Sequence, residues 1–145
     1  MKTEVRHWDD KSRTEYQYDN AGNQTRTTDY GADGAMTCDI QYENNQGGDC
    51  IGWKVYNDER NLIHTFEVER YPSGLEAEIR QYDPNGAFVR REVSFYDSNS
   101  RIRQMQYFDN ENILRGTSTY EWDANGELTI KHFDLKGNLL DHPAA

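Results

Sequence analysis

The sequence predicts an all-β protein, an antiparallel meander of about ten strands built from hairpin repeats of ~12 residues. We expect the sheet to be open and strongly twisted or curled. Two observations lead to this prediction. A short phrase recurs along the chain, in which an aromatic residue and usually an aspartate precede two or three polar residues and a glycine or asparagine. In addition, no segment keeps a helical periodicity for more than about two turns.

The aromatic residues that open these phrases are evenly spaced. Their separations range from 10 to 15 residues and average 12.5. Between them lie stretches rich in Thr, Val, Ile, Tyr and charged residues, which favour strands. The chain therefore alternates strand and turn, with the turns opened by Trp8, Tyr18, Tyr30, Tyr42, Tyr56, Tyr71, Tyr82, Tyr96, Phe108, Trp122 and Phe133.

The best preserved phrase, QYDPNGAFV, contains the turn Asp83-Pro84-Asn85-Gly86. Aspartate at the first position, proline at the second and asparagine at the third suit a type I turn, and glycine then supplies a left-handed residue that closes a bulged hairpin. Other turns begin with Asp and end with Gly in the same way. The turns at 97–100 and 109–112 lack the glycine, so we expect them to be looser.

Composition limits the core and the range of partners. The chain of 145 residues is predicted to be one domain, 1–145, and with 34% hydrophobic residues it cannot build a thick, two-sided core. The net charge of −10 repels nucleic acid and anionic lipid and attracts a basic protein surface. The same charge also serves simply to keep an all-β protein soluble, and both interpretations stay open.

Location and redox state follow from what the sequence lacks. No run approaches the roughly 18 apolar residues of a membrane span, and the stretch MKTEVRHWDDKSRTE has no apolar signal region. We therefore expect a cytoplasmic protein that does not bind membranes. Cys38 and Cys50 are expected to be reduced in that compartment, although a bridge between adjacent strands stays open.

One hairpin, TFEVERYPSGLEAEIR, indicates a candidate binding face. The turn at 71–74 sets the apolar residues of both arms on the inward face. The outward face then carries Glu67, Glu69, Glu76 and Glu78, with Glu69 opposite Glu76 and Glu67 opposite Glu78.

Continuing this pairing through the turn at 83–86 places Glu92 beside Glu78 and adds it to the face. Arg80 and Arg90 lie at its margin and can neutralise part of the charge. The five glutamates are therefore either a docking surface for a basic partner or a solvated strand face.

Signals for catalysis are missing. The four histidines, at 7, 64, 132 and 142, are far apart, and two cysteines cannot complete a four-ligand zinc site. No phosphate-binding glycine loop and no nucleophile motif occurs. We expect no catalytic residue, no metal ion, no cofactor and no enzymatic activity.

The phrase is most complete at YDNAGNQTRTTDYGADG, which resembles the YD repeats of Rhs proteins. The likeness extends from about Trp8 to Leu139. It implies a β-hairpin scaffold without catalytic residues. This chain departs from the family in being much shorter than the family's shells and in having lost the glycine from several units.

Loci of Rhs and other polymorphic toxins typically include a small cytoplasmic immunity protein, often acidic and rich in β-structure. The resemblance thus implies a non-enzymatic immunity protein that binds and neutralises a cognate, basic toxin domain. The alternative is a structural or carbohydrate-binding module of a surface or secreted protein, in which Trp8, Trp53, Trp122 and the tyrosines stack on sugar rings.

Overall fold

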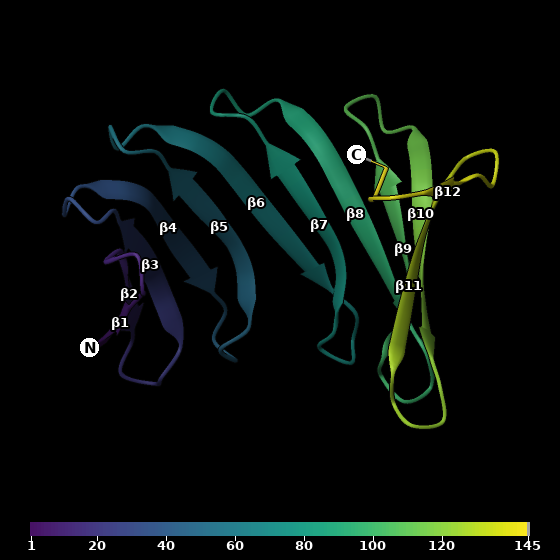
Figure 1. The fold of residues 1–145 in the computed structure, drawn as a ribbon, viewed down its shortest axis with the longest axis horizontal. Coiled ribbons are helices and arrows are strands. Elements are labelled where there is room, and N and C mark those ends of the chain that lie inside the picture. The colour runs from purple at the N-terminus through teal and green to yellow at the C-terminus, as the bar shows by residue number, and fades with distance from the viewer. Residues whose placement is uncertain (145) are drawn as a thin grey trace. The chain divides into compact units, whose positions relative to one another are not determined.

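The computed structural model describes residues 1–144 and shows an all-β meander. Twelve strands follow one another in the sheet in chain order, each antiparallel to the next (Figure 1). No helix occurs in residues 1–144. The strands are β1 (Lys2–His7), β2 (Arg13–Tyr18), β3 (Gln24–Tyr30), β4 (Met36–Asn44), β5 (Cys50–Tyr56), β6 (Leu62–Arg70), β7 (Glu76–Tyr82), β8 (Phe88–Tyr96), β9 (Ile102–Phe108), β10 (Leu114–Trp122), β11 (Leu128–Asp134) and β12 (Leu139–Leu140).

This arrangement confirms the predicted fold class, with two strands more than the ten expected. The chain divides into two compact units. The first contains Met1–Glu67 and Tyr82–Ala87, and the second contains Val68–Gln81 and the chain from Phe88 onward. The expectation of a single domain stays a prediction.

A single turn geometry recurs at all eleven hairpins of residues 1–144. In the turn that opens at Asp83, the Asp83 N–H donates to the Ala87 carbonyl at 2.9 Å, and the Gly86 N–H donates to the Asp83 carbonyl at 3.0 Å. The same two bonds close every other hairpin, at distances between 2.8 and 3.1 Å. The recurring phrase therefore encodes one backbone conformation, which every turn adopts.

The aspartate of the phrase caps this turn. Asp83 Oδ1 accepts hydrogen bonds from the backbone N–H groups of Asn85 and Ala87, both at 2.9 Å. These bonds satisfy backbone donors that the hairpin itself leaves unpaired. The same pair of bonds is made by Asp19, Asn57, Asp97, Asp109, Asp123 and Asp134.

The fourth residue of each turn has a positive φ, whether or not it is glycine. Gly86 has φ 86°, while Ser100 and Asn112 reach 62°. The turns at 97–100 and 109–112 also keep both closing hydrogen bonds, each set within 2.8–3.0 Å. The expectation that they are looser is therefore wrong, because the aspartate cap holds the conformation without glycine.

Arg60 occupies the same left-handed position with φ 62°, so replacing it with glycine should stabilise the protein. An L-residue pays roughly 1–2 kcal/mol there, and the extra freedom of glycine in the unfolded chain offsets part of the gain. We expect Arg60→Gly to raise the free energy of unfolding by about 0.5 kcal/mol in urea titrations. Gly86→Ala, whose added Cβ meets no atom within 4 Å, is the matched reverse change and should lower it. Equal midpoints for both variants would contradict this account.

The capping aspartates also predict a loss of stability in acid. Hydrogen bonds from the backbone N–H four residues on lower the pKa of Asp19, Asp97, Asp109 and Asp134 below the usual range. A depressed folded-state pKa gives stability that is present above the unfolded value, about 3.9, and is lost as the pH falls through the folded value. Urea midpoints should therefore drop below about pH 4.

The control is Asp97→Asn, because asparagine accepts the same backbone bonds, as Asn57 already does, but does not titrate. Its urea midpoint should depend less on pH between about 5 and 2 than that of the unmodified protein. An unchanged dependence would show that the caps do not cause the acid effect.

Beside six of the turns, the strand register shifts by one residue. Between β2 and β3, Tyr18 faces Gln24 but Gln17 faces Arg26, so Thr25 is the extra residue of a β-bulge. Equivalent shifts occur in the hairpins β3–β4, β4–β5, β5–β6, β8–β9 and β9–β10. Relative to an uninterrupted pairing, each bulge exchanges the faces of all later residues of the bulged strand.

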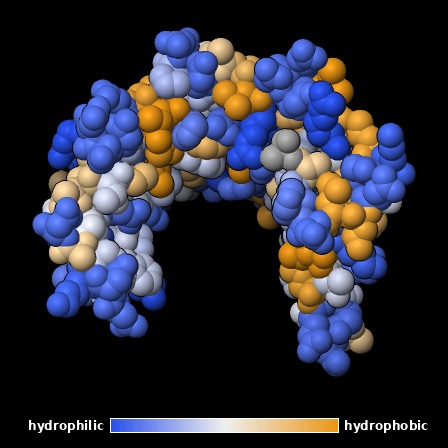
Figure 2. Space-filling view, turned by 45° about the horizontal axis from the view of Figure 1, so that its top comes forward, coloured by the Kyte–Doolittle hydropathy of each residue, from blue (hydrophilic) through white to orange (hydrophobic). Residues whose placement is uncertain are grey.

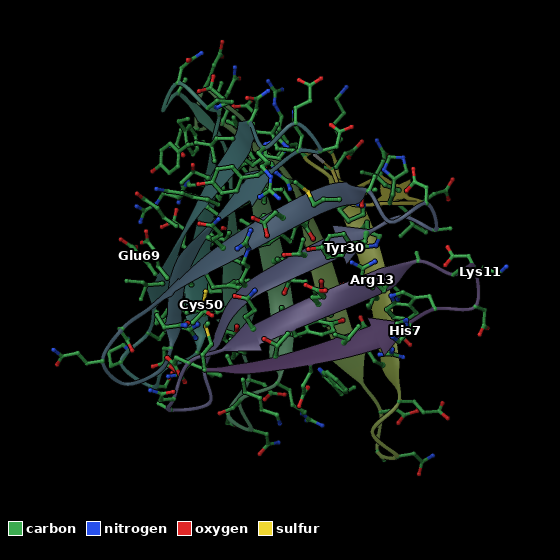
Figure 3. All side chains as sticks on the ribbon, turned by 90° about the vertical axis from the view of Figure 1, so that its left-hand side faces the viewer. His7, Lys11, Arg13, Tyr30, Cys50 and Glu69 are labelled. Carbon is green, nitrogen blue, oxygen red and sulfur yellow. The ribbon has the colours of Figure 1, made fainter. Side chains whose placement is uncertain are left out.

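The interior consists of side chains pressed against their neighbours on the strands. Among residues 1–144 the buried apolar side chains are only Val68 and Tyr107, whereas Thr14, Thr28, Asp39, Gln81 and Ser118 are buried and polar. Side chains emerge from both faces of the strands, as Figure 3 shows for the first unit, where the Arg13 guanidinium lies 4.0 Å from the centre of the Tyr30 ring. The expected lack of a thick apolar core is confirmed for these residues.

Cys38 and Cys50 are both free. Cys50 lies opposite Asn44 of β4, six residues along that strand from Cys38. Six residues span about 20 Å, far beyond the roughly 7 Å that a disulfide tolerates between the α-carbons of its cysteines. The open possibility of a bridge between them is therefore excluded in this fold.

Candidate protein-binding face

Most of the glutamates predicted to form a binding face lie on β6, β7 and β8 of the second unit. Glu69 comes from β6, Glu76 and Glu78 from β7, and Glu92 from β8. Glu67 belongs to the first unit, where its Oε2 accepts a hydrogen bond from the Tyr82 hydroxyl at 3.2 Å. The face is described below within the second unit.

Arginines are interleaved with the glutamates. Arg80 Nη2 lies 2.5 Å from Glu69 Oε1 and 3.3 Å from Glu78 Oε2. Arg91 Nη1 lies 2.8 Å from Glu78 Oε1. The Glu–Arg cluster is the name used from here on for Glu69, Glu78, Arg80 and Arg91 together with the ion pair between Glu76 of β7 and Arg70 of β6.

The two glutamates of β7 are bound differently. Glu76 Oε1 is 3.8 Å from Arg70 Nη2, and its side chain is 45% exposed. Glu78 is 15% exposed and lies between two guanidinium groups. Burial alone raises the pKa of Glu78, but hydrogen bonds from Arg91 and Arg80 outweigh that effect and lower the pKa. Glu78 is thus an ionised, structural member of the cluster.

Arg91 is fixed from several sides. Its Nε donates to Asn112 Oδ1 at 2.6 Å, and its guanidinium carbon lies 3.8 Å from the centre of the Phe108 ring. Together with Arg80 and Glu78 it lines an open pocket that also contacts Phe88. One of its lining residues, Arg80, contacts Glu69, whose side chain is 61% exposed.

Glu92 lies on the other face from Glu78. Arg91 bonds Glu78, whereas its chain neighbour Arg90 bonds Gln81 Oε1 at 2.7 Å and lies 3.4 Å from Glu92. Side chains alternate along a strand, so Glu92 shares the face of Arg90 and Gln81. The expected pairing of Glu92 with Glu78 is therefore not formed. Whether any of the five glutamates binds a partner stays a prediction.

A buried charged network in the first unit was not predicted. Asp39, 3% exposed, accepts two bonds from Arg26 at 2.8 and 3.0 Å and one from the Thr28 hydroxyl at 2.8 Å. Burial raises the pKa of Asp39, and these bonds more than reverse the effect, so the pKa is lowered. No local motif signals this network, because its members come from different strands.

The second unit contains an unpredicted chain of polar contacts. The Tyr107 hydroxyl lies 2.9 Å from Ser118 Oγ, which lies 2.6 Å from His132 Nδ1. Ser118 is fully buried, with 0% exposure. A substrate cannot reach a hydroxyl in that position, so this serine–histidine contact joins β9, β10 and β11 and is not a nucleophilic site.

Each of the three tryptophans has a ring face occupied by another side chain. Trp53 stacks on Phe66 with ring centres 4.8 Å apart, while Arg6 lies over Trp8 and Arg101 over Trp122. In the view of Figure 2, hydrophobic side chains form separate groups between hydrophilic ones. These arrangements do not favour an aromatic platform for sugars.

Residues 1–144 contain neither a metal-binding cluster nor a membrane-spanning helix. No group of three or more histidine, cysteine, aspartate or glutamate side chains is placed to hold a metal ion. The same residues contain no helix that could span a membrane.

Comparison with known proteins gives likenesses in structure only. No family of sequences and no curated protein matches the chain. A chain of the Tc holotoxin pore of Photorhabdus luminescens, in a mutant form, is 16% identical and has a TM-score of 0.49. The match covers 94% of this chain and 9% of that one. A porin-like protein from Bacteroides uniformis ATCC 8492 is 12% identical, with a TM-score of 0.55 and coverage of 91% and 54%. The chain thus spans about a tenth and about half of these proteins, and the second likeness shows an all-β fold alone.

Proposed function

We propose that this chain is a non-enzymatic, cytoplasmic protein-binding domain, an immunity protein that neutralises a bacterial toxin. The toxin domain is basic and docks on the Glu–Arg cluster. The resemblance to YD repeats and the net charge of −10 support this proposal. The observation that carries it is the ordering of the exposed carboxylates of that cluster.

Glu69 and Glu76 present their carboxylates at 61% and 45% exposure, while their partners Arg80 and Arg70 are exposed by only 27% and 20%. The less exposed guanidinium groups therefore orient the more exposed carboxylates by ion pairing. A partner's lysine or arginine meets acceptors that are already oriented, which reduces the entropy cost of binding. Complementary charge also raises the association rate and excludes acidic partners.

The proposal is tested with the toxin domain encoded beside this chain. The purified chain should retain a basic toxin domain in a pull-down and abolish its toxicity when both are co-expressed. The variant Glu69→Lys/Glu76→Lys should lose both effects.

The matched control is Glu127→Lys, because Glu127 is an exposed turn residue whose only described hydrogen bonds use its backbone. It should behave as the unmodified chain. Retention of the toxin by the double variant, at the level of the control, would contradict the proposed face.

A further inference from the structure

The first strand lies at one edge of the sheet formed by residues 1–144. β1 is the end strand, it pairs only with β2, and all six of its residues are exposed. Its pairing with β2 runs from Lys2 to His7 without a bulge, so nothing bends the strand away from a neighbour. Such an edge is a template for another strand.

The hydrogen bonds of the first turn show which backbone N–H and carbonyl groups of β1 face away from β2. The Trp8 N–H donates to the Ser12 carbonyl at 3.0 Å, which marks Trp8 as bonded toward β2. Hydrogen-bonding direction alternates along an antiparallel strand. Arg6, Glu4 and Lys2 therefore bond toward β2, whereas Thr3, Val5 and His7 turn their N–H and carbonyl groups to the open edge.

We propose that β1 pairs with β1 of a second copy of this chain, antiparallel, about a two-fold axis at Val5. In this register Val5 faces Val5, and Thr3 faces His7 on each side of the axis. Each of these facing pairs can exchange two backbone hydrogen bonds. This inference does not depend on the proposed function.

Side-chain charge favours this register over its neighbour. Glu4 of each copy lies opposite Arg6 of the other, and Lys2 lies opposite Trp8. Opposite charges in facing positions stabilise a strand pair. A two-fold axis at Glu4 places Glu4 opposite Glu4 and Lys2 opposite Arg6, which are repulsive pairs. An axis at Thr3 also gives an attractive pair, Glu4 opposite Lys2, and it is distinguished by Arg6→Glu, which reverses the Glu4–Arg6 pairs of the axis at Val5.

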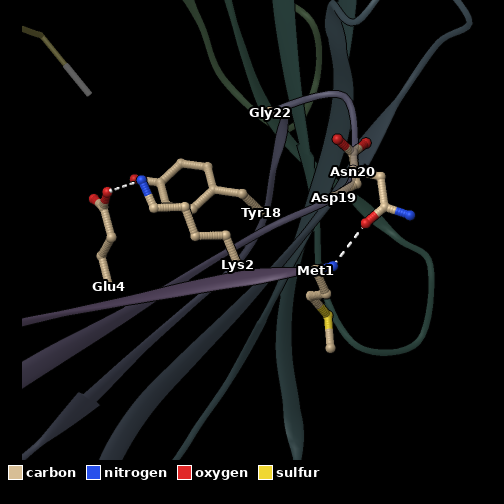
Figure 4. Close-up of a pocket in the computed structure, with 7 residues that line it drawn as sticks. All are labelled: Met1, Lys2, Glu4, Tyr18, Asp19, Asn20 and Gly22. Atoms are coloured by element: carbon tan, nitrogen blue, oxygen red, sulfur yellow. Dashed lines mark hydrogen bonds and ion pairs between the residues drawn. The ribbon is translucent and has the colours of Figure 1, made fainter.

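The structure already orders the groups that this pairing uses. Lys2 Nζ lies 2.7 Å from Glu4 Oε1, and the Met1 ammonium donates to Asn20 Oδ1 at 2.7 Å, which fixes the start of β1 (Figure 4). The Arg6 guanidinium lies 4.3 Å from the centre of the Trp8 ring. Val5 and Trp8 are 47% and 41% exposed, so the pairing covers apolar area at its centre and its ends.

An interface made of one strand pair is small, and we expect a weak dimer. Interfaces that bury less than about 1,200 Å² belong to the transient class. Sedimentation velocity of the full chain, over concentrations up to about 1 mM, should show a reversible monomer–dimer equilibrium.

The backbone hydrogen bonding between the two copies is tested with Val5→Pro. The Val5 N–H points to the open edge, so proline removes a hydrogen bond between copies and leaves the bonds to β2 in place. The variant should unfold at a urea concentration close to that of the unmodified chain and should be monomeric at every concentration. A dimer that persists in this folded variant would overturn the proposal.

The register is tested with charge reversal. Glu4→Arg and Arg6→Glu each convert two attractive pairs into repulsive ones, which should raise the dimer dissociation constant roughly thirty-fold. Mixing the two variants restores both attractive pairs, so a heterodimer should form with the original affinity. A monomeric unmodified chain, or a mixture that associates no better than its components, would overturn the proposal.

Discussion

Replacing Asp39 with alanine is expected to lower the free energy of unfolding by about 3 kcal/mol. The Asp39 side chain is 4% exposed and accepts bonds from Arg26, Thr28 and Gln41. Alanine leaves the Thr28 hydroxyl buried without its partner and leaves the Arg26 charge uncompensated. Urea unfolding followed by circular dichroism measures the loss.

Asp39→Asn is the control for this prediction. Asparagine keeps the shape and one acceptor for Thr28 and removes the charge, so it should destabilise the protein less than alanine does. A cost below about 1 kcal/mol for Asp39→Ala would mean that the network is solvated and contributes little.

Replacing Gly52 with alanine should also be strongly destabilising, by about 2–3 kcal/mol. A Cβ at this position lies 2.6 Å from the Phe66 carbonyl oxygen, and that oxygen belongs to the backbone of the adjacent strand β6. The strand pair must separate to relieve the contact. The measurement is again the urea midpoint.

Gly47→Ala is the matched control, since its Cβ meets only the Asn45 side chain, at 3.3 Å, and the Asp49 side chain, at 4.0 Å, and Gly47 is an exposed turn residue. It should change the stability by less than about 0.5 kcal/mol. Equal effects of the two substitutions would show that β5 and β6 approach each other less closely than described.

Turns and strands could be predicted from the sequence because each turn is encoded by neighbouring residues. Asp83 and Gly86 act within one loop, the aspartate as cap and the glycine by its positive φ. The tolerance of Ser100 and Asn112 at the same position was missed, because it depends on how much strain the cap of Asp97 or Asp109 can hold.

Register was harder to predict, since it depends on bulges that no residue type marks uniquely. The extra residue is Thr25 in one hairpin and Thr37 in the next, yet Ile51 and Arg103 take the same role elsewhere. One unrecognised bulge exchanges the faces of a strand. The pairing drawn from the sequence placed Glu92 beside Glu78, whereas in the structure Arg91 contacts Glu78.

The glutamates of the candidate site could be predicted from the sequence, but their arginine partners could not be fully predicted. The alternation of Glu76 and Glu78 along one strand predicts a shared face, whereas in the structure Glu76 contacts Arg70 and Glu78 contacts Arg80 and Arg91. Their charge compensation was visible only in part, because the long side chains of Arg80 and Arg91 reach across strands to carboxylates that the register brings near. Because arginines alternate with glutamates, the surface carries carboxylates oriented by ion pairs and is not uniformly acidic.

The central claim is that the Glu–Arg cluster binds a basic toxin domain, and the association rate with that domain tests it most directly. Measured by stopped flow at low salt, the rate for Glu69→Lys/Glu76→Lys should fall at least about ten-fold, while Glu127→Lys should stay near the unmodified rate. The difference should shrink as salt is added, since charge steering is screened. An unchanged rate for the double variant at low salt would contradict the claim.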